Sequence, residues 1–220
     1  MIIPQAAAAG LLAGDVHRQR IRLEPRASAR LVSAGATMVY GAGAGDGGPS
    51  ETAWRFEIGA DARLVNRGEP YVLHGPARLR STQTVILAET GRLLTWDSVV
   101  FSGDIDAAWT SEFVVESPDG AALLIDAQRA APGALARQGG PTPRWRAFGA
   151  LHALAPASPR ATLVRAAASG LARTSPGVFA AAAPLSGSLG LGVRIAASTG
   201  GELRLALQDV AGHLAEALEL

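Results

Sequence analysis

The chain has 220 residues, 48% of them hydrophobic, and its formal net charge is +1. A chain of this length can bury enough apolar surface to fold without covalent staples; it has no cysteine, which excludes disulfides and thiolate metal sites. The near-neutral charge argues against attraction to nucleic acid or to an anionic membrane surface.

The N-terminal segment, residues 1–12, is apolar and rich in alanine. A signal peptide begins with a positively charged region, and no basic residue precedes Arg18. No stretch reaches the roughly 18 uninterrupted apolar residues that a membrane-spanning helix requires. The sequence therefore predicts a soluble, cytoplasmic protein.

A repeated pattern follows, in which a β-rich run, a polar turn and a second β-rich run recur four times. The second β-rich runs contain Leu31, Leu64, Leu93 and Leu123, separated by 29 to 33 residues. A fixed period of this size is typical of stacked β-architectures, in which neighbouring units bury the apolar face that one unit cannot bury alone. Residues 1–127 are therefore predicted to form stacked antiparallel hairpins in an elongated β-superhelix or sandwich-like body.

Within these repeats the side-chain alternation predicts individual strands. Trp54, Phe56 and Ile58 share one face of a run, which is the period of a half-buried strand. Residues 93–101 are apolar on both faces apart from Asp97, so this run is predicted to be a central strand covered on both sides.

The pattern changes after residue 143. Strands are expected over 144–154, 178–182 and 189–197. Ser158 before Pro159 predicts the start of a helix over 159–172. Thr199 and Glu202 have the spacing of a capping box, and a leucine-rich stripe follows, so a second helix is predicted to the C-terminus. Together, 144–220 form the C-terminal strands and two helices of a single domain spanning 1–220.

Residues that could carry chemistry are sparse. The four histidines lie far apart in the sequence, and there is no G-x-S-x-G nucleophile motif. The acids of interest are Asp15 after a glycine-rich turn, Glu69 at a corner, and Asp97 inside an apolar strand. A buried carboxylate is costly unless it is paired. Asp97 is therefore either a structural acid that arginine or backbone N–H groups satisfy, or a carboxylate that faces a wet internal cavity and handles a cation.

Several phrases, in this order, resemble the UreD (UreH) family of urease accessory proteins. They are residues 9–15 (AGLLAGD), 27–40 (ASARLVSAGATMVY), 62–77 (ARLVNRGEPYVLHGPA), 91–103 (GRLLTWDSVVFSG) and, more loosely, 192–195 (GVRI) before the last helix. The chain departs from the family pattern at Met38 and Gly41, where basic residues are usual. The strands that normally precede the glycine turn are missing, so the chain is expected to be a divergent, N-terminally short member.

The resemblance implies a scaffold that is not an enzyme. Family members bind the urease apoprotein and a helical F-type accessory protein, on which a nickel-carrying GTPase docks, and nickel passes through a water-filled path. Nickel(II) accepts carboxylate and imidazole ligands, and scattered acids without a histidine cluster suit a path better than a storage site. Asp15, Glu69 and Asp97 are the candidates for this path, with Asp15 and Asp97 expected to line it; nickel(II) would be transient, and no tightly bound cofactor is expected.

Two other classes of protein remain open. A stacked β-scaffold also suits a β-helical carbohydrate-active enzyme, but aromatic residues make up only 5% of the chain and its tryptophans are dispersed. The other alternative is a generic β-rich protein-interaction module without a metal role.

Overall fold

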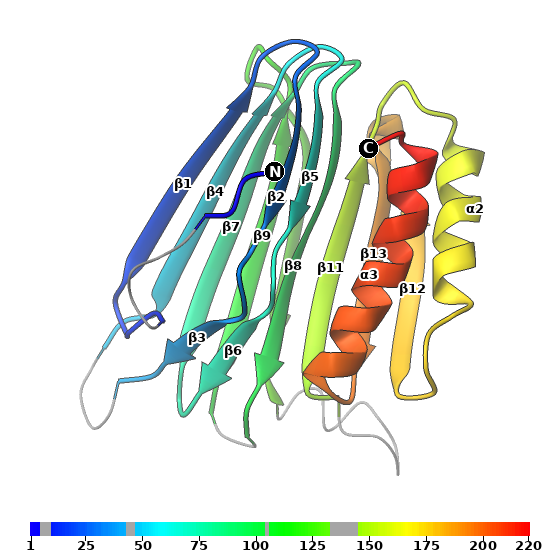
Figure 1. The fold of residues 1–220 in the computed structure, drawn as a ribbon. Coiled ribbons are helices and arrows are strands. Elements are labelled where there is room, and N and C mark those ends of the chain that lie inside the picture. Colours follow the sequence, from blue (N-terminus) through cyan, green and yellow to red (C-terminus); the bar gives the residue numbers. More distant parts are fainter. Residues whose placement is uncertain (5–9, 43–46, 104–105, 133–144) are drawn as a thin grey trace.

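The computed structural model describes residues 1–220 apart from 5–9, 43–46, 104–105 and 133–144. Two β-sheets lie face to face, and two helices cover part of the larger sheet (Figure 1). The prediction of a mainly β fold with two helices in the C-terminal third is confirmed.

The smaller sheet begins at the first long strand and ends at a hairpin. Its strands lie in the order β1 (Val16–Leu23), β4 (Ser50–Ile58), β7 (Arg78–Leu87), β9 (Ala108–Glu116) and β10 (Ala122–Ala130).

The larger sheet extends further toward the C-terminal elements. Its strands lie in the order β2 (Ser28–Val32), β5 (Arg63–Arg67), β8 (Arg92–Phe101), β11 (Ala147–Leu154), β13 (Gly190–Ala197) and β12 (Val178–Pro184). Two short strands join it, because β6 (Tyr71–His74) pairs with both β8 and β3 (Thr37–Tyr40).

The repeated pattern corresponds to turns of a β-superhelix. In the first three copies the two β-rich runs lie in different sheets. The first runs pair in parallel from each copy to the next through β1, β4, β7 and β9, and the second runs do so through β2, β5 and β8. The predicted antiparallel hairpins are therefore wrong for these three copies, whereas the fourth copy, β9 and β10, does form one. Alternation of apolar residues fixes the face that a side chain takes and is the same for both pairings, so it could not identify the partner strand.

The turns between the two sheets stack closely on one another. The N–H group of Arg26 donates to the carbonyl of Ala60 in the next turn over 2.8 Å. A Cβ atom at Gly59 would lie 2.8 Å from the backbone nitrogen of Pro25, so this approach requires glycine.

Two of the repeated leucines share one register position of the superhelix. Leu64 and Leu93 are register neighbours in β5 and β8, and both are buried. Leu31 in β2 is also buried, but its register partner is Asn66 and not Leu64. Leu123 differs because β10 returns to the smaller sheet, and its side chain is 41% exposed.

The C-terminal third adds antiparallel strands and a helical layer. β11 pairs with β8 and β13, and β13 pairs with β12. Helices α2 (Arg160–Leu171) and α3 (Gly200–Ala217) pack against this part of the sheet. Along β8, Leu93 faces the core between the sheets and Leu94 faces the helices, so the predicted central strand is confirmed.

The helix starts were predicted with mixed success. The capping box of α3 is present: Thr199 Oγ1 accepts from the Glu202 N–H over 3.2 Å, and the Glu202 carboxylate accepts from the Thr199 N–H over 3.1 Å. Ser158 does not cap α2. The backbone of Pro159 is extended, with ψ of 123°, so the helix begins one residue later and Pro159 itself occupies the N-cap position.

The interior between the sheets has a polar layer between two apolar cores. Along β7, Leu79 belongs to one core and Val85 to the other, while Ser81 and Gln83 lie between them and are buried. The same division occurs on β8, where the buried Asp97 lies in the polar layer. Polar side chains therefore form one layer that crosses the superhelix between the two apolar cores.

Candidate functional site

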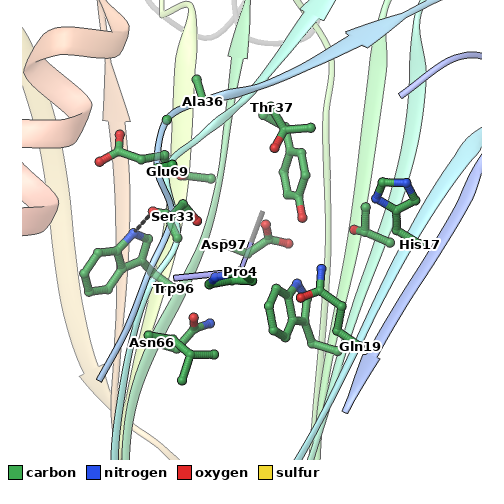
Figure 2. Close-up of a pocket in the computed structure, with 18 of the residues that line it drawn as sticks. Pro4, His17, Gln19, Ser33, Ala36, Thr37, Asn66, Glu69, Trp96 and Asp97 are labelled. Atoms are coloured by element: carbon green, nitrogen blue, oxygen red, sulfur yellow. Dashed lines mark hydrogen bonds between the residues drawn. The ribbon is translucent and has the colours of Figure 1, made fainter. Parts of the chain in front are cut away.

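A cavity of about 530 Å³ lies in this polar layer. Its outer end is lined by the edge strand β1 and by the segment that follows β2, and its inner end is lined by β8. Figure 2 shows Asp97 near the centre, with His17 and Gln19 on the side of β1. The polar side chains that line it include His17, Gln19, Asn66, Tyr71, Gln83 and Asp97.

One row of polar residues crosses the whole smaller sheet at the level of this cavity. His17, Thr52, Ser81, Ser111 and Gln128 are successive register partners from β1 to β10. Because register partners on neighbouring strands point to the same face, all five side chains point toward the larger sheet. The row is therefore a polar seam, a name used below for these five residues.

Asp97 faces the polar seam from the larger sheet. Its Oδ2 atom accepts hydrogen bonds from Ser81 and from Ser111, the latter over 2.9 Å, and Ser81 Oγ accepts in turn from Trp109 Nε1 over 2.9 Å. Burial raises the pKa of the Asp97 carboxyl, and the two serine hydrogen bonds partly oppose this rise. Serine hydroxyls, and no arginine among the described residues, therefore hold this acid, and it also lines a cavity.

Tyr71 completes the wall near Asp97. Burial, together with the nearby Asp97 charge, raises the pKa of the Tyr71 hydroxyl to about 12, because both effects disfavour the phenolate. The side chain is therefore neutral at physiological pH and supplies a hydroxyl group beside Thr52 and Trp54.

Amide side chains form a second hydrogen-bond network, next to the polar seam in the cavity wall. Asn66 Nδ2 donates to Thr95 Oγ1 and Thr95 Oγ1 donates to Gln83 Oε1, each over 3.0 Å. Gln83 Nε2 reaches the carbonyl of Trp96 over 3.4 Å. These bonds fix two amide groups in the cavity wall and join the two sheets.

A charged cluster lies at the opposite end of the polar layer, on β10, β11 and β13. The Asp126 carboxylate contacts His152 Nε2 over 2.8 Å and pairs with the Arg194 guanidinium. The His152 ring is stacked on Phe113, with centroids 3.8 Å apart. The hydrogen bond from His152 and the charge of Arg194 lower the pKa of Asp126, whereas burial lowers the pKa of His152 and keeps it neutral.

The predicted acids occupy three different environments. Asp97 is buried at the inner end of the cavity, and Glu69 lines its wall with a carboxylate turned toward α3 (Figure 2). Asp15 is not part of the cavity lining; its Oδ2 accepts from the Leu12 N–H over 2.8 Å and caps a turn. Whether any of them meets a metal stays a prediction.

Sequence reasoning did not identify the serines that hold Asp97 or the Asp126–His152 pair. Ser81 and Ser111 stand at inward positions of strands with clear alternation, where a polar residue is unusual. That signal could have drawn attention to them. Among the described residues, no three histidine or acidic side chains lie close enough to hold a metal ion tightly.

Comparison with known proteins identifies the relationship. The family model of the UreD urease accessory protein matches residues 2–219. The chain belongs to the UreD family of urease accessory proteins. It is also 34% identical over 222 residues to the urease accessory protein UreD of Mycolicibacterium smegmatis, covering 96% of this chain and 74% of that relative.

The family membership decides between the protein classes left open by the sequence. A UreD protein is an accessory protein of urease and not an enzyme, which sets aside the carbohydrate-active alternative. In the part of the chain that the structure describes, no helix is long and apolar enough to span a membrane.

Proposed function

We propose that this UreD protein is a cytoplasmic scaffold for urease maturation that helps deliver nickel(II) to the urease active site. It binds the urease apoprotein and the helical F-type accessory protein, and the nickel-carrying GTPase docks on that second partner. Nickel(II) is cargo and passes through the cavity that ends at Asp97. The observation that carries the nickel path is the buried Asp97 carboxylate in a polar cavity of about 530 Å³ between the sheets.

The donor set of the cavity suits brief contacts with a cation. Asp97, Asn66, Gln83 and Tyr71 offer carboxylate, amide and hydroxyl oxygens, which are weaker nickel ligands than thiolates or clustered imidazoles. A site with several strong ligands would trap the ion. Successive weak contacts let it move on.

The protonation of Asp97 supports the same role. Burial raises the pKa of the Asp97 carboxyl, which reflects the cost of holding its negative charge in the interior. A dication beside the carboxylate compensates that charge and favours the ionised form. The carboxylate in turn lowers the electrostatic cost of bringing a dication into the interior.

Glu69 and Asp15 have different roles in this proposal. Glu69 belongs to the cavity wall on the side of α3 and is a candidate contact there. Asp15 acts as a turn cap in this proposal, because its carboxylate is engaged by the backbone of Leu12.

The test is co-expression of the chain with urease and the other accessory proteins, followed by measurement of nickel per urease active site. Asp97→Asn and Asp97→Ala are expected to lower nickel content and urease activity while the variant chain still co-purifies with its partners. Asp15→Asn serves as the control and is expected to retain both.

Three results would contradict the proposal. Normal nickel content with Asp97→Ala would reject the path through the cavity. Equal nickel content with and without the chain would reject the maturation role. A pull-down that recovers neither urease nor a helical accessory partner would favour an interaction module without a metal role.

A further inference from the structure

The larger sheet extends one strand beyond the smaller sheet on the C-terminal side of the sandwich. β9 faces β11 through the stacked rings of Phe113 and His152. β10 faces β13 through the ion pair of Asp126 and Arg194. β10 ends the smaller sheet, whereas β12 follows β13 in the larger one. Because neighbouring strands lie about 4.8 Å apart, β12 lies opposite the position that a strand added beside β10 would take.

The face of β12 that points toward this position is apolar and exposed. We name it the apolar ledge, and its residues are Phe179, Ala181 and Ala183. Ala181 is the register partner of Arg194, whose side chain points toward the smaller sheet, so the three ledge residues point the same way. Phe179 is 66% exposed, and both alanines are exposed. On the other face of β12, Ala180 packs against the core beneath the helices, so β12 is covered on one face and bare on the other.

β10 borders the apolar ledge and has an open edge. Among the described residues it pairs with β9 alone, which leaves backbone groups along its other edge available for pairing. At its centre Ile125, which is 64% exposed, and Ala127 point outward, and the inward charge of Asp126 is compensated by Arg194. The other edge strand of this sheet, β1, carries charged outward residues, which are Arg18, Arg20 and Arg22. Outward charges protect an edge from pairing, so β10 is the less protected edge of the smaller sheet.

Size and charge define the segment that fits. Packed sheets lie about 10 Å apart, and each alanine of the ledge projects a single carbon, so the added strand must supply large apolar side chains on its inward face. Arg129 is exposed near the end of β10 and forms no ion pair among the described residues. An acidic residue opposite Arg129 complements this charge, and an apolar residue opposite Ile125 continues the outward apolar surface.

The same geometry argues against a second copy of this chain as the occupant. A two-fold pairing of β10 with β10 of another copy would bring the other copy's β13 to the position that β12 already takes, because β13 lies opposite β10 in each copy. The overhanging β12 therefore leaves room for one extended segment and not for a second sandwich.

We propose that the open edge of β10 and the apolar ledge bind an extended segment of a partner protein, which adds a strand to the five-stranded smaller sheet. The segment places large apolar residues on the ledge and an acidic residue opposite Arg129. Backbone hydrogen bonds to β10 supply the pairing, while the ledge and Arg129 supply selectivity. The proposal goes beyond the proposed function, because it does not depend on the cavity at Asp97.

The test uses a synthetic peptide of this pattern and the full-length chain. The peptide Glu-Val-Thr-Leu-Val-Ile-Thr, with blocked ends and a dye on a Gly-Ser linker, is designed to pair antiparallel to β10 with its glutamate opposite Arg129. Titration followed by fluorescence anisotropy is expected to show binding that is about fivefold tighter than that of the peptide with lysine in place of glutamate. Arg129→Glu is expected to reverse this preference, and an unchanged preference would exclude Arg129 as the charge contact.

Variants of the ledge test the second contact surface. Ala181→Glu and Ala183→Glu each place a carboxylate at an exposed position, and the second keeps the test available if the first disturbs folding. Each is expected to weaken peptide binding at least about tenfold, because the added strand would bury the charge. Val164→Glu is the matched control: Val164 is 42% exposed on α2, at the other face of the sheet, and its substitution is expected to leave the affinity unchanged.

Amide hydrogen exchange with and without the peptide locates the added strand. Protection is expected along residues 122–130 and not along 16–23. Absence of binding, equal weakening by Val164→Glu, or protection of β1 in place of β10 would overturn the proposal. Sedimentation of the chain alone tests the other occupant, since a dimer that Ala181→Glu dissociates would assign the apolar ledge to a second copy and reject a partner segment.

Discussion

The Ser111 hydroxyl donates a hydrogen bond to the Asp97 carboxylate across the interface between the two sheets, over 2.9 Å. The bond joins β9 of the smaller sheet to β8 of the larger one. Buried polar contacts of this kind are often no more stabilising than apolar packing of the same volume. Their main consequence here is chemical, because they hold a carboxyl group at the inner end of a cavity.

Asp97→Asn is expected to stabilise the isolated fold at neutral pH by about 1–3 kcal/mol, since it removes a buried charge while keeping the side-chain shape. The folded-state pKa of Asp97 is raised above its ordinary value of 3.8, so the folded state binds more protons than the unfolded state above that pH. Wild-type stability therefore falls as pH rises from about 4 through the raised pKa, and the variant lacks this loss. Urea unfolding at a series of pH values measures the difference, and parallel stability curves would contradict it.

His152→Gln is expected to reduce the loss of folding stability that the wild type shows as the pH falls. Burial lowers the folded-state pKa of His152 below its ordinary value of 6.5, so the unfolded state binds the proton more readily. Wild-type stability consequently falls as pH drops below 6.5, and glutamine removes this contribution. Thermal melts between pH 7 and about 5 measure it. The same slope in both proteins would show that His152 is not a buried neutral histidine.

Gly170→Ala is expected to separate the two helices. A Cβ atom at Gly170 would lie 2.6 Å from Val210 Cα, so α2 and α3 must move apart at a cost of about 1–3 kcal/mol. Gly212→Ala in α3 is the matched control. Its added Cβ meets no described atom within 4 Å, and alanine there should stabilise the helix by up to about 1 kcal/mol. Denaturant unfolding of both variants gives the comparison, and similar effects of the two would contradict the close packing at Gly170.

Thr199→Ala is expected to cost about 1 kcal/mol, because it removes the oxygen that accepts from the Glu202 N–H group at the start of α3. Thr162→Ala, inside α2, provides a control in which alanine replaces threonine without loss of an N-cap. The free energies of unfolding decide the point: equal losses in the two variants would mean that the cap contributes nothing specific.

Much of the secondary structure followed from local patterns. The alternation of Trp54, Phe56 and Ile58 predicted β4, and the spacing of Thr199 and Glu202 predicted the start of α3. Strand pairing did not follow, because the turns after Leu23 and Ile58 lead the chain into the opposite sheet and not back along the same one. Both arrangements bury the same alternate residues, so the alternation could not distinguish a hairpin from a crossing to the opposite sheet.

The sequence by itself determined the β-rich body, its repeat, the two late helices and the presence of one acid in an otherwise apolar strand, because each depends on residues near one another in the chain. Only the tertiary structure decided that Asp97 meets Ser81 and Ser111, that Asp15 stays apart in a turn, and that Asp126 pairs with Arg194. Those contacts depend on the parallel register of strands far apart in the sequence. That register sets which inward side chains share a level, and a one-residue shift would turn every polar group of the seam to the other face.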